Sequence, residues 1–171
     1  MEGTAMSEPV YVVHEHPAGR AAPYYMAHVD LSFTGLDGQL EQLWLNDLGD
    51  NTYRVACIPF CVDGLSYLDV VQLNKDSGRV ATLLRRFGHR VMRALVKPGE
   101  PGAVANLAES LTAAAERAGV AFEWHGDRFL ALDVAPGSDN GDLPALLDKA
   151  SKEGLLQAGF GDTNSFPPAV G

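Results

Sequence analysis

The stretch VACIPFCVDGLSYLDVV, residues 55–71, decides how the chain is expected to fold. Its first eight residues carry no charge, and an apolar run this short is typical of a buried strand rather than a membrane span. Pro59 has no amide hydrogen for a neighbouring strand, so it marks the end of the strand or a bulge in it. Asp63-Gly64 favours a turn, because glycine accepts a positive φ and aspartate can bond its own backbone. A second apolar strand is expected to follow.

The composition excludes some classes of protein. The 171 residues suffice for one medium domain or two small units with a shared core, and 46% hydrophobic and 20% charged residues are ordinary for a globular protein. The net charge of −9 argues against general binding to nucleic acids or anionic membranes. No secretory signal or membrane-length apolar run is visible. The two cysteines, both in the central stretch, favour reduced thiols in the cytosol.

The first half of the chain is predicted to be mostly antiparallel β structure. Turn signals at residues 35–38, 49–51 and 76–78 separate β-rich runs. The expected strands are residues 10–14, 24–33, 40–48, 52–58, 68–73 and 80–87. We therefore predict a barrel-like or curled β unit over residues 9–87, after a flexible N-terminal tail at residues 1–8.

The second half alternates between strands and helices. Apolar residues recur with helical spacing from Val104 to Ala118, followed by Gly119 as a C-terminal cap, and Asp142 is a plausible start for a second helix. The expected strands are residues 89–97, 120–124, 128–134 and 155–160. The order βαββαβ is the ferredoxin-like pattern. The prediction is an α+β fold with a ferredoxin-like unit at 88–160 packed on the β unit, and a flexible tail at 161–171.

Short motifs are spread along the chain. They are Glu41–Trp44 with Leu48-Gly49, Tyr53-Arg54, Ile58-Pro59-Phe60 with Gly64, Asp69-Val70-Val71, and Gly88-His89 with Arg93. Together they cover most of residues 25–160 and resemble the bacterial family called domain of unknown function 4265. The sequence departs from that pattern at Leu68, where a glycine is expected. The resemblance implies the two-part α+β layout and no activity.

Positive charge is concentrated in residues 75–97, which hold seven basic residues and one acid, about +6, so the remainder carries about −15. In a strand from His89, the side chains of His89 and Arg93 share one face and Arg90 lies on the other. If helices cover the second face, His89 and Arg93 lie on an open face, with Arg85 or Arg86 arriving from the preceding loop. The guanidinium fork suits phosphate or carboxylate, so the candidates for binding a small anionic ligand are His89, Arg86, Arg90 and Arg93. Alternatively, the arginines pair with the chain's own acids.

Two further pairs of residues, one polar and one of cysteines, are candidates for a functional site. Tyr67 and Asp69 can line a pocket and act as an acid or base, but such residues more often serve a turn or pack with the hydroxyl outward. Cys57 and Cys61 have the wrong spacing for a zinc knuckle and are expected to be a buried structural pair. A general-base contact from His89 would instead make a cysteine enzymatic.

Two histidines near the N-terminus are a further candidate. His14 and His16 flank Glu15 and are expected to point the same way from a strand, or to lie at the end of one before Pro17. Two imidazoles so placed can bind a metal, but no third ligand can be named. We therefore expect no metal and no cofactor.

Two functions are consistent with these features. The first is a non-enzymatic binding or accessory protein of the bacterial cytosol, of the immunity or regulatory type, that binds a basic protein partner through its negative charge. The alternative is a binder of, or enzyme for, a small anionic ligand that uses the segment around His89. Catalytic residues stay unassigned, because no familiar catalytic or phosphate-binding motif is present. Neither hypothesis involves nucleic acid or a membrane.

Overall fold

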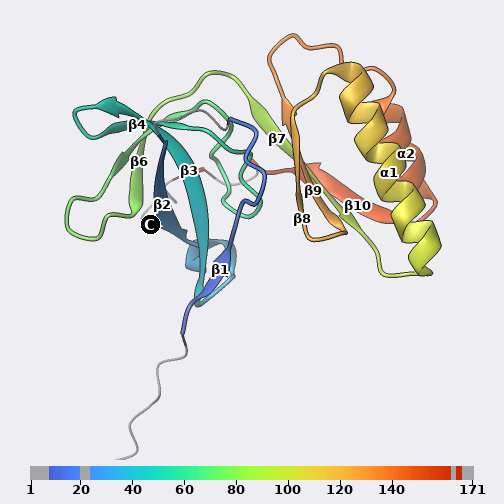
Figure 1. Ribbon diagram of the computed structural model, residues 1–171, viewed down its shortest axis with the longest axis horizontal. Helices are drawn as coiled ribbons and strands as arrows, with labels where there is room; N and C mark the ends of the chain where they lie inside the picture. The colour runs from blue at the N-terminus through green and yellow to red at the C-terminus, as the bar shows by residue number, and fades with distance from the viewer. Residues whose placement is uncertain (1–7, 20–23, 163–164, 167–171) are drawn as a thin grey trace, which may run out of the picture.

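The computed structural model describes residues 8–19, 24–162 and 165–166. Within them the chain forms a mixed α+β fold with one six-stranded sheet, one four-stranded sheet and two α-helices (Figure 1). The first sheet comes from the first half of the chain, and the second sheet and both helices come from the second half. The predicted α+β class is confirmed. Of the predicted tail at residues 1–8, only Glu8 lies within the described residues.

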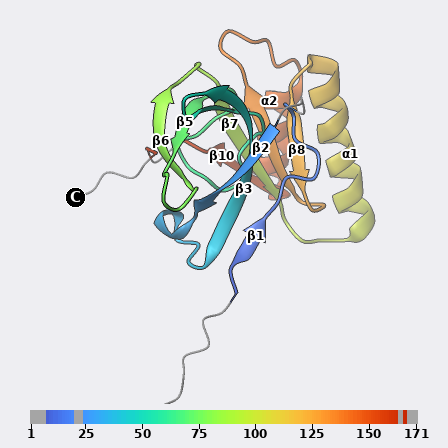
Figure 2. The same ribbon diagram turned by 60° about the vertical axis from the view of Figure 1, so that its left-hand side comes forward.

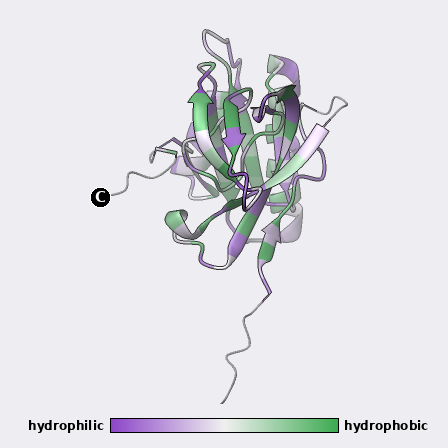
Figure 3. Ribbon diagram, turned by 90° about the vertical axis from the view of Figure 1, so that its left-hand side faces the viewer, coloured by the Kyte–Doolittle hydropathy of each residue, from purple (hydrophilic) through white to green (hydrophobic). Residues whose placement is uncertain are grey.

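The first sheet is a meander with one added strand. Its strands are β1 (Val10–Val12), β2 (Tyr24–Asp30), β3 (Gln39–Gly49), β4 (Thr52–Val55), β5 (Val70–Leu73) and β6 (Val80–Arg85). Strands β2 to β6 pair antiparallel in order, whereas β1 pairs parallel with β3. Within the described residues no ladder joins β6 back to β2, so the curled sheet stays open (Figure 2). Hydrophobic and hydrophilic residues both occur along its strands, as burial of one face requires (Figure 3).

The central apolar run is a loop rather than a strand. Strand β4 ends at Val55 and β5 begins only at Val70, so the prediction of a strand over residues 52–58 is wrong beyond Val55. The physical reason is that the backbone amides of Ile58, Phe60, Cys61 and Val62 donate to two buried carboxyl groups instead of to a neighbouring strand. The predicted turn at Asp63-Gly64 is present, and Gly64 has a φ of +80°.

Leu68 adopts the tight turn for which a glycine was expected. Its φ is +71°, and its amide donates to the carbonyl of Val55 across 2.9 Å. The left-handed region costs a non-glycine residue about 1–2 kcal/mol. Leu68→Gly is therefore expected to raise the free energy of unfolding by up to about 1 kcal/mol, as measured by urea denaturation.

Asp50→Gly is the matched control for that measurement. Asp50 also has a positive φ, of 53°, but aspartate tolerates this region better than leucine, so a smaller gain is expected. If Leu68→Gly instead loses stability, the packing of the half-buried leucine outweighs its backbone strain.

The second sheet carries both helices on one face (Figure 1). Its elements are β7 (Arg90–Val96), α1 (Pro101–Ala118), β8 (Phe122–His125), β9 (Phe129–Val134), α2 (Leu143–Lys152) and β10 (Leu156–Phe160). The strand order is β10-β7-β9-β8, and each neighbouring pair is antiparallel. The Glu100 carboxylate caps α1 by accepting from the amides of Gly102 and Ala103, and Gly119 ends it with a φ of +68°. The predicted helix and its glycine cap are confirmed.

The two faces of the second sheet belong to two different cores. Ala94 and Val96 of β7 pack against the helices. Val91 of β7 and Ala131 of β9 lie on the opposite face and join the core of the first sheet. The expectation that this opposite face is open is therefore wrong, because the first unit covers it. Beyond β10, the Gly161 amide donates to the Val91 carbonyl, and the buried Phe166 contacts Phe33, so these described residues of the predicted tail are held in place.

Candidate functional site

His14 is buried between two carboxyl groups that come from different sheets. Its Nε2–H donates to Glu41 of β3 across 2.9 Å, and its Nδ1–H donates to Glu123 of β8 across 2.7 Å. Carboxylate oxygens only accept hydrogen bonds, so this arrangement fits a doubly protonated imidazolium. The imidazole also stacks on Phe60, with ring centroids 4.3 Å apart. We call His14, Glu41 and Glu123 the charged junction, because they join the two sheets.

The two carboxyl groups of the charged junction also hold the central loop. Glu41 accepts from the amides of Phe60, Cys61 and Val62, at 2.6–2.9 Å. Glu123 accepts from the amides of Ile58 and Ala18. These are charge-assisted bonds in a site that water does not reach, since Glu41 is 0% and Glu123 is 3% exposed. The charged junction therefore replaces the strand ladder that the apolar run lacks.

The pKa values fit an ionised His14. Burial alone lowers the pKa of His14, but its bonds to Glu123 and Glu41 favour the charged form, and the pKa lies well above its usual range. Burial raises the pKa of Glu41, yet the bonds from His14 and from the loop amides hold it below its usual range. A buried imidazolium and a buried carboxylate thus stabilise each other's charged form.

The two cysteines and His16 lie in different surroundings. Cys57 is buried beside His14, and Cys61 is half-buried; both are free thiols. Burial raises the pKa of Cys57, and it raises the pKa of Cys61 to about 12, so neither is an activated thiolate. His16 is exposed whereas His14 points inward, so the expected shared direction is wrong, because β1 already ends at Val12. In the described part of the chain, no three or more His, Cys, Asp or Glu side chains are placed to hold a metal ion.

His89 and Tyr67 lie together at the edge of the contact between the sheets. His89 Nδ1–H donates to both oxygens of Asp133, at 2.8 and 2.9 Å, and the Tyr67 ring meets the imidazole edge-on, with centroids 5.8 Å apart. Burial raises the pKa of Asp133 and of Tyr67. Asp69 is buried, and its carboxylate accepts hydrogen bonds from the amides of Ser66 and Phe87. It therefore stabilises a turn, which was the alternative to lining a pocket. Its pKa is raised by burial.

Two of the three predicted arginines, Arg90 and Arg93, are bound to different acids of the chain itself. Arg93 donates to Asp63 across 2.8 Å and also to the Val62 carbonyl. Arg90 donates to Asp162 through two nitrogens and lies over the Phe160 ring. The charge of Arg86 lowers the pKa of Asp69 and of Asp162, which places it near both. The structure therefore favours internal pairing of these arginines over one convergent anion site.

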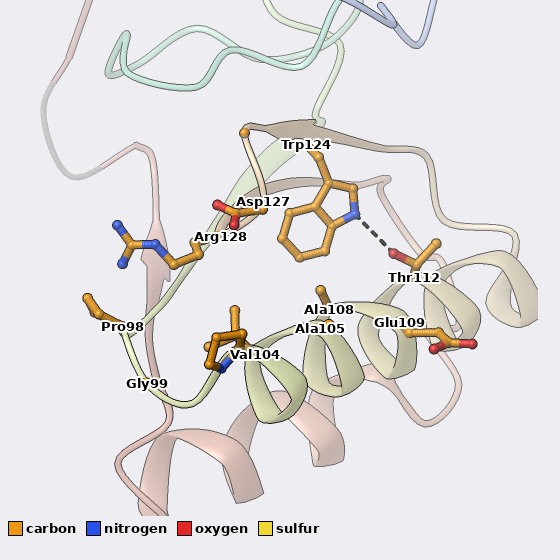
Figure 4. Close-up of a pocket in the computed structure, with 12 residues that line it drawn as sticks. Pro98, Gly99, Val104, Ala105, Ala108, Glu109, Thr112, Trp124, Asp127 and Arg128 are labelled. Carbon is orange, nitrogen blue, oxygen red and sulfur yellow. Dashed lines mark hydrogen bonds between the residues drawn. The ribbon is translucent and has the colours of Figure 1, made fainter.

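A groove of about 610 Å³ lies between α1 and the hairpin that joins β8 to β9 (Figure 4). Trp124 of β8 points toward α1, and its indole N–H donates to the Thr112 hydroxyl across 3.0 Å. The helix side of the groove has an apolar wall that includes Val104, Ala105 and Ala108, and Glu109 and Thr112 of the same helix also line it. Its ionisable lining residues are Glu109, Asp127 and Arg128. The volume is within the range of small-molecule binding pockets.

The charged lining of the groove is more acidic than basic. Arg128 donates to the Val96 carbonyl across 3.1 Å, so part of its guanidinium is already engaged. No described residue forms an ion pair with Glu109 or Asp127. The groove thus combines an apolar wall with two acids that lack a cationic partner in the described chain.

Sequence reasoning did not identify the groove or the charged junction. Glu41 and Glu123 are single acids within β-rich runs, and a lone acid in a strand normally indicates a solvated face. The only sequence feature that drew attention to Glu41 was its place at the start of the Glu41–Trp44 motif. Trp124 and Thr112 lie on different elements, so their contact is set by the tertiary fold.

These features define a two-sheet α+β protein with a buried charged junction and a surface groove beside its second sheet. The chain belongs to the family described as Domain of unknown function (DUF4265), whose sequence model matches residues 41–158. The resemblance predicted from the motifs is thereby confirmed. No curated protein matches the chain.

The fold is also similar to that of a solved structure, described as "Novel crystal structure of a hypothetical protein from Neisseria gonorrhoeae". The two sequences are 17% identical, the alignment covers 81% of this chain and 93% of that chain, and the TM-score is 0.59. At this identity the likeness shows the fold alone. Neither α1 nor α2, the helices of the described chain, has the length and apolar character that crossing a bilayer needs.

Proposed function

We propose that this is a non-enzymatic binding or accessory protein, of the immunity or regulatory type, that holds an extended basic segment of a partner protein in the groove between α1 and the β8–β9 hairpin. The observation that carries the proposal is the lining of the groove, in which Trp124 stands beside the apolar wall of α1 and two acids lie at the edges. Tryptophan is enriched among residues that dominate binding energy. Glu109 and Asp127 favour lysine or arginine in the partner, and the net charge of −9 steers such a partner toward the protein.

We also propose an architecture and a cellular location for the protein. We assign residues 88–160 to the ferredoxin-like pattern, supported by the βαββαβ order and the all-antiparallel sheet β10-β7-β9-β8. Residues 9–87 form the barrel-like unit that covers its other face. We place the protein in the bacterial cytosol, since free Cys57 and Cys61 suit a reducing compartment.

Selection from a random peptide library displayed on phage tests this function. Peptides selected on the wild-type protein are expected to be rich in Lys and Arg and to bind less tightly as salt increases. Ala105→Arg fills the groove with a cationic side chain and should weaken those peptides by about tenfold or more. Asn106→Arg adds the same charge to the next exposed residue of α1, outside the groove, and should bind as the wild type does. If no peptide is selected, or if both variants bind equally, the proposed function is wrong.

A small anionic ligand at His89 is the second candidate function. The favouring observation is that Asp133 holds Nδ1–H with both oxygens, while no described residue bonds Nε2. Arg86 and Tyr67 are the neighbouring groups that would complete such a site. Titration with inorganic phosphate, followed through the His89 ring by NMR, should shift its signals in the wild type and less in Arg86→Ala. Absence of any shift removes this candidate, and peptide binding at the groove should survive His89→Ala in either case.

A further inference from the structure

Strand β8 lies at the end of its sheet. The order β10-β7-β9-β8 leaves one side of Phe122–His125 without a neighbouring strand among the described residues. Such an edge presents backbone N–H and C=O groups that a further strand can bind. The groove beside Trp124 opens next to this edge, so an occupant of the groove is within reach of the strand.

The hydrogen-bond pattern shows which backbone groups of β8 point outward. The Asp133 amide donates to the Ala121 carbonyl across 2.9 Å, so Ala121 and Asp133 form a hydrogen-bonded pair. Pairs alternate along an antiparallel ladder, so Glu123 and His125 also direct their backbone groups toward β9. The N–H and C=O groups of Phe122 and Trp124 therefore point away from the sheet, as the template for another strand.

We infer that the partner segment binds by adding a strand to the free edge of β8, pairing with the backbone of Phe122 and Trp124. This inference rests on the proposed function and specifies its mode. Residues of the added strand alternate in direction, so every second side chain faces the α1 side and enters the groove against Trp124. A lysine or arginine of the segment then meets Asp127 on the hairpin or Glu109 on α1.

The opposite edge of the sheet is less suited to the same partner. A second pocket lies between α2 and β10, but its acid, Asp148, is paired with Lys152 across 2.8 Å. Arg90 lies 3.6 Å from the centre of the Phe160 ring at the end of β10, and its bonds to Asp162 occupy that acid as well. Of the two sheet edges, the β8 edge is the one whose groove offers a basic segment two acids without a cationic partner among the described residues.

Backbone methylation of the selected peptides tests whether they bind by strand addition to β8. This test is separate from the test of whether the groove binds basic peptides. Two versions of one peptide carry N-methyl groups on alternate amides. Strand addition predicts that one version loses about tenfold or more in affinity while the other binds as the parent does, because only one set of amides faces β8. Hydrogen exchange of the Phe122 and Trp124 amides should slow on binding, whereas exchange at Ala158 of β10 should not change.

The results of these experiments distinguish strand addition from the proposed binding function. If both methylated versions bind like the parent, or if the Phe122 and Trp124 amides gain no protection, strand addition is overturned. The proposed function then still stands, provided that Ala105→Arg blocks binding. If the library yields no peptide, the proposed function and the strand addition fail together.

Discussion

Replacing Glu41 by glutamine is expected to lower the free energy of unfolding by about 3–5 kcal/mol, the usual cost of removing one partner of a buried ion pair. Glutamine keeps the size of the side chain but turns one oxygen into an NH₂ donor. That donor must face either the imidazolium of His14 or the amides of Cys61 and Val62, all of which donate. Each orientation leaves buried donors without an acceptor.

Urea denaturation followed by circular dichroism measures this change, and Glu109→Gln is the matched control. Glu109 is exposed on α1, so its loss should change stability by no more than about 0.5 kcal/mol. If Glu41→Gln is as mild as this control, the carboxylate of Glu41 does not carry the charge that the geometry assigns to it.

Stability is expected to fall as pH rises above neutral, by up to about 1.4 kcal/mol per pH unit. The cause is His14, whose pKa in the folded protein is raised well above its ordinary value of 6.5. Between these two pKa values the folded state binds one more proton than the unfolded state. The contribution of His14 is therefore fully present below the unfolded pKa and is lost as pH rises through the folded pKa.

His28, the two cysteines and Tyr67 affect stability outside the range from pH 6.5 to about 8.5. The pKa of His28 is lowered by burial, so its effect lies below 6.5. The raised pKa values of Cys57 and Cys61 matter only above their ordinary value of 9.0, and that of Tyr67 only above 10.0.

Urea midpoints measured across this pH range, in the wild type and two glutamine variants, check the assignment. His14→Gln should remove the slope, and His28→Gln should keep it. A flat profile in the wild type, or an equal slope in His14→Gln, contradicts an ionised His14 in the folded protein.

Local signals sufficed for much of the fold. Alternation and turn residues located most strands, and helical spacing with Gly119 located α1, because these signals depend on neighbours in the sequence. The loop at residues 56–62 was missed for a physical reason. Its composition suits a strand, but Glu41 and Glu123 supply the acceptors that a strand would take from a ladder. Acceptors so distant in the sequence leave no local signature.

The candidate site was harder to predict for the same reason. His89 was recognised as a polar group in a strand, but its partner Asp133 lies 44 residues away. Arg93 was expected on an open face, yet packing of the first unit brings Asp63 against it. The groove depends on how far α1 stands from β8, which is a property of helix packing rather than of either segment.

The charged junction also has a consequence for the kinetics of folding. His14 and Glu123 are separated by 109 positions in the chain, so their contact forms only after a long loop has closed. Without β8, His14 would have only Glu41 as its carboxylate partner and the Ile58 amide of the central loop would lack its acceptor. The core of the first unit is therefore complete only when the second sheet is in place.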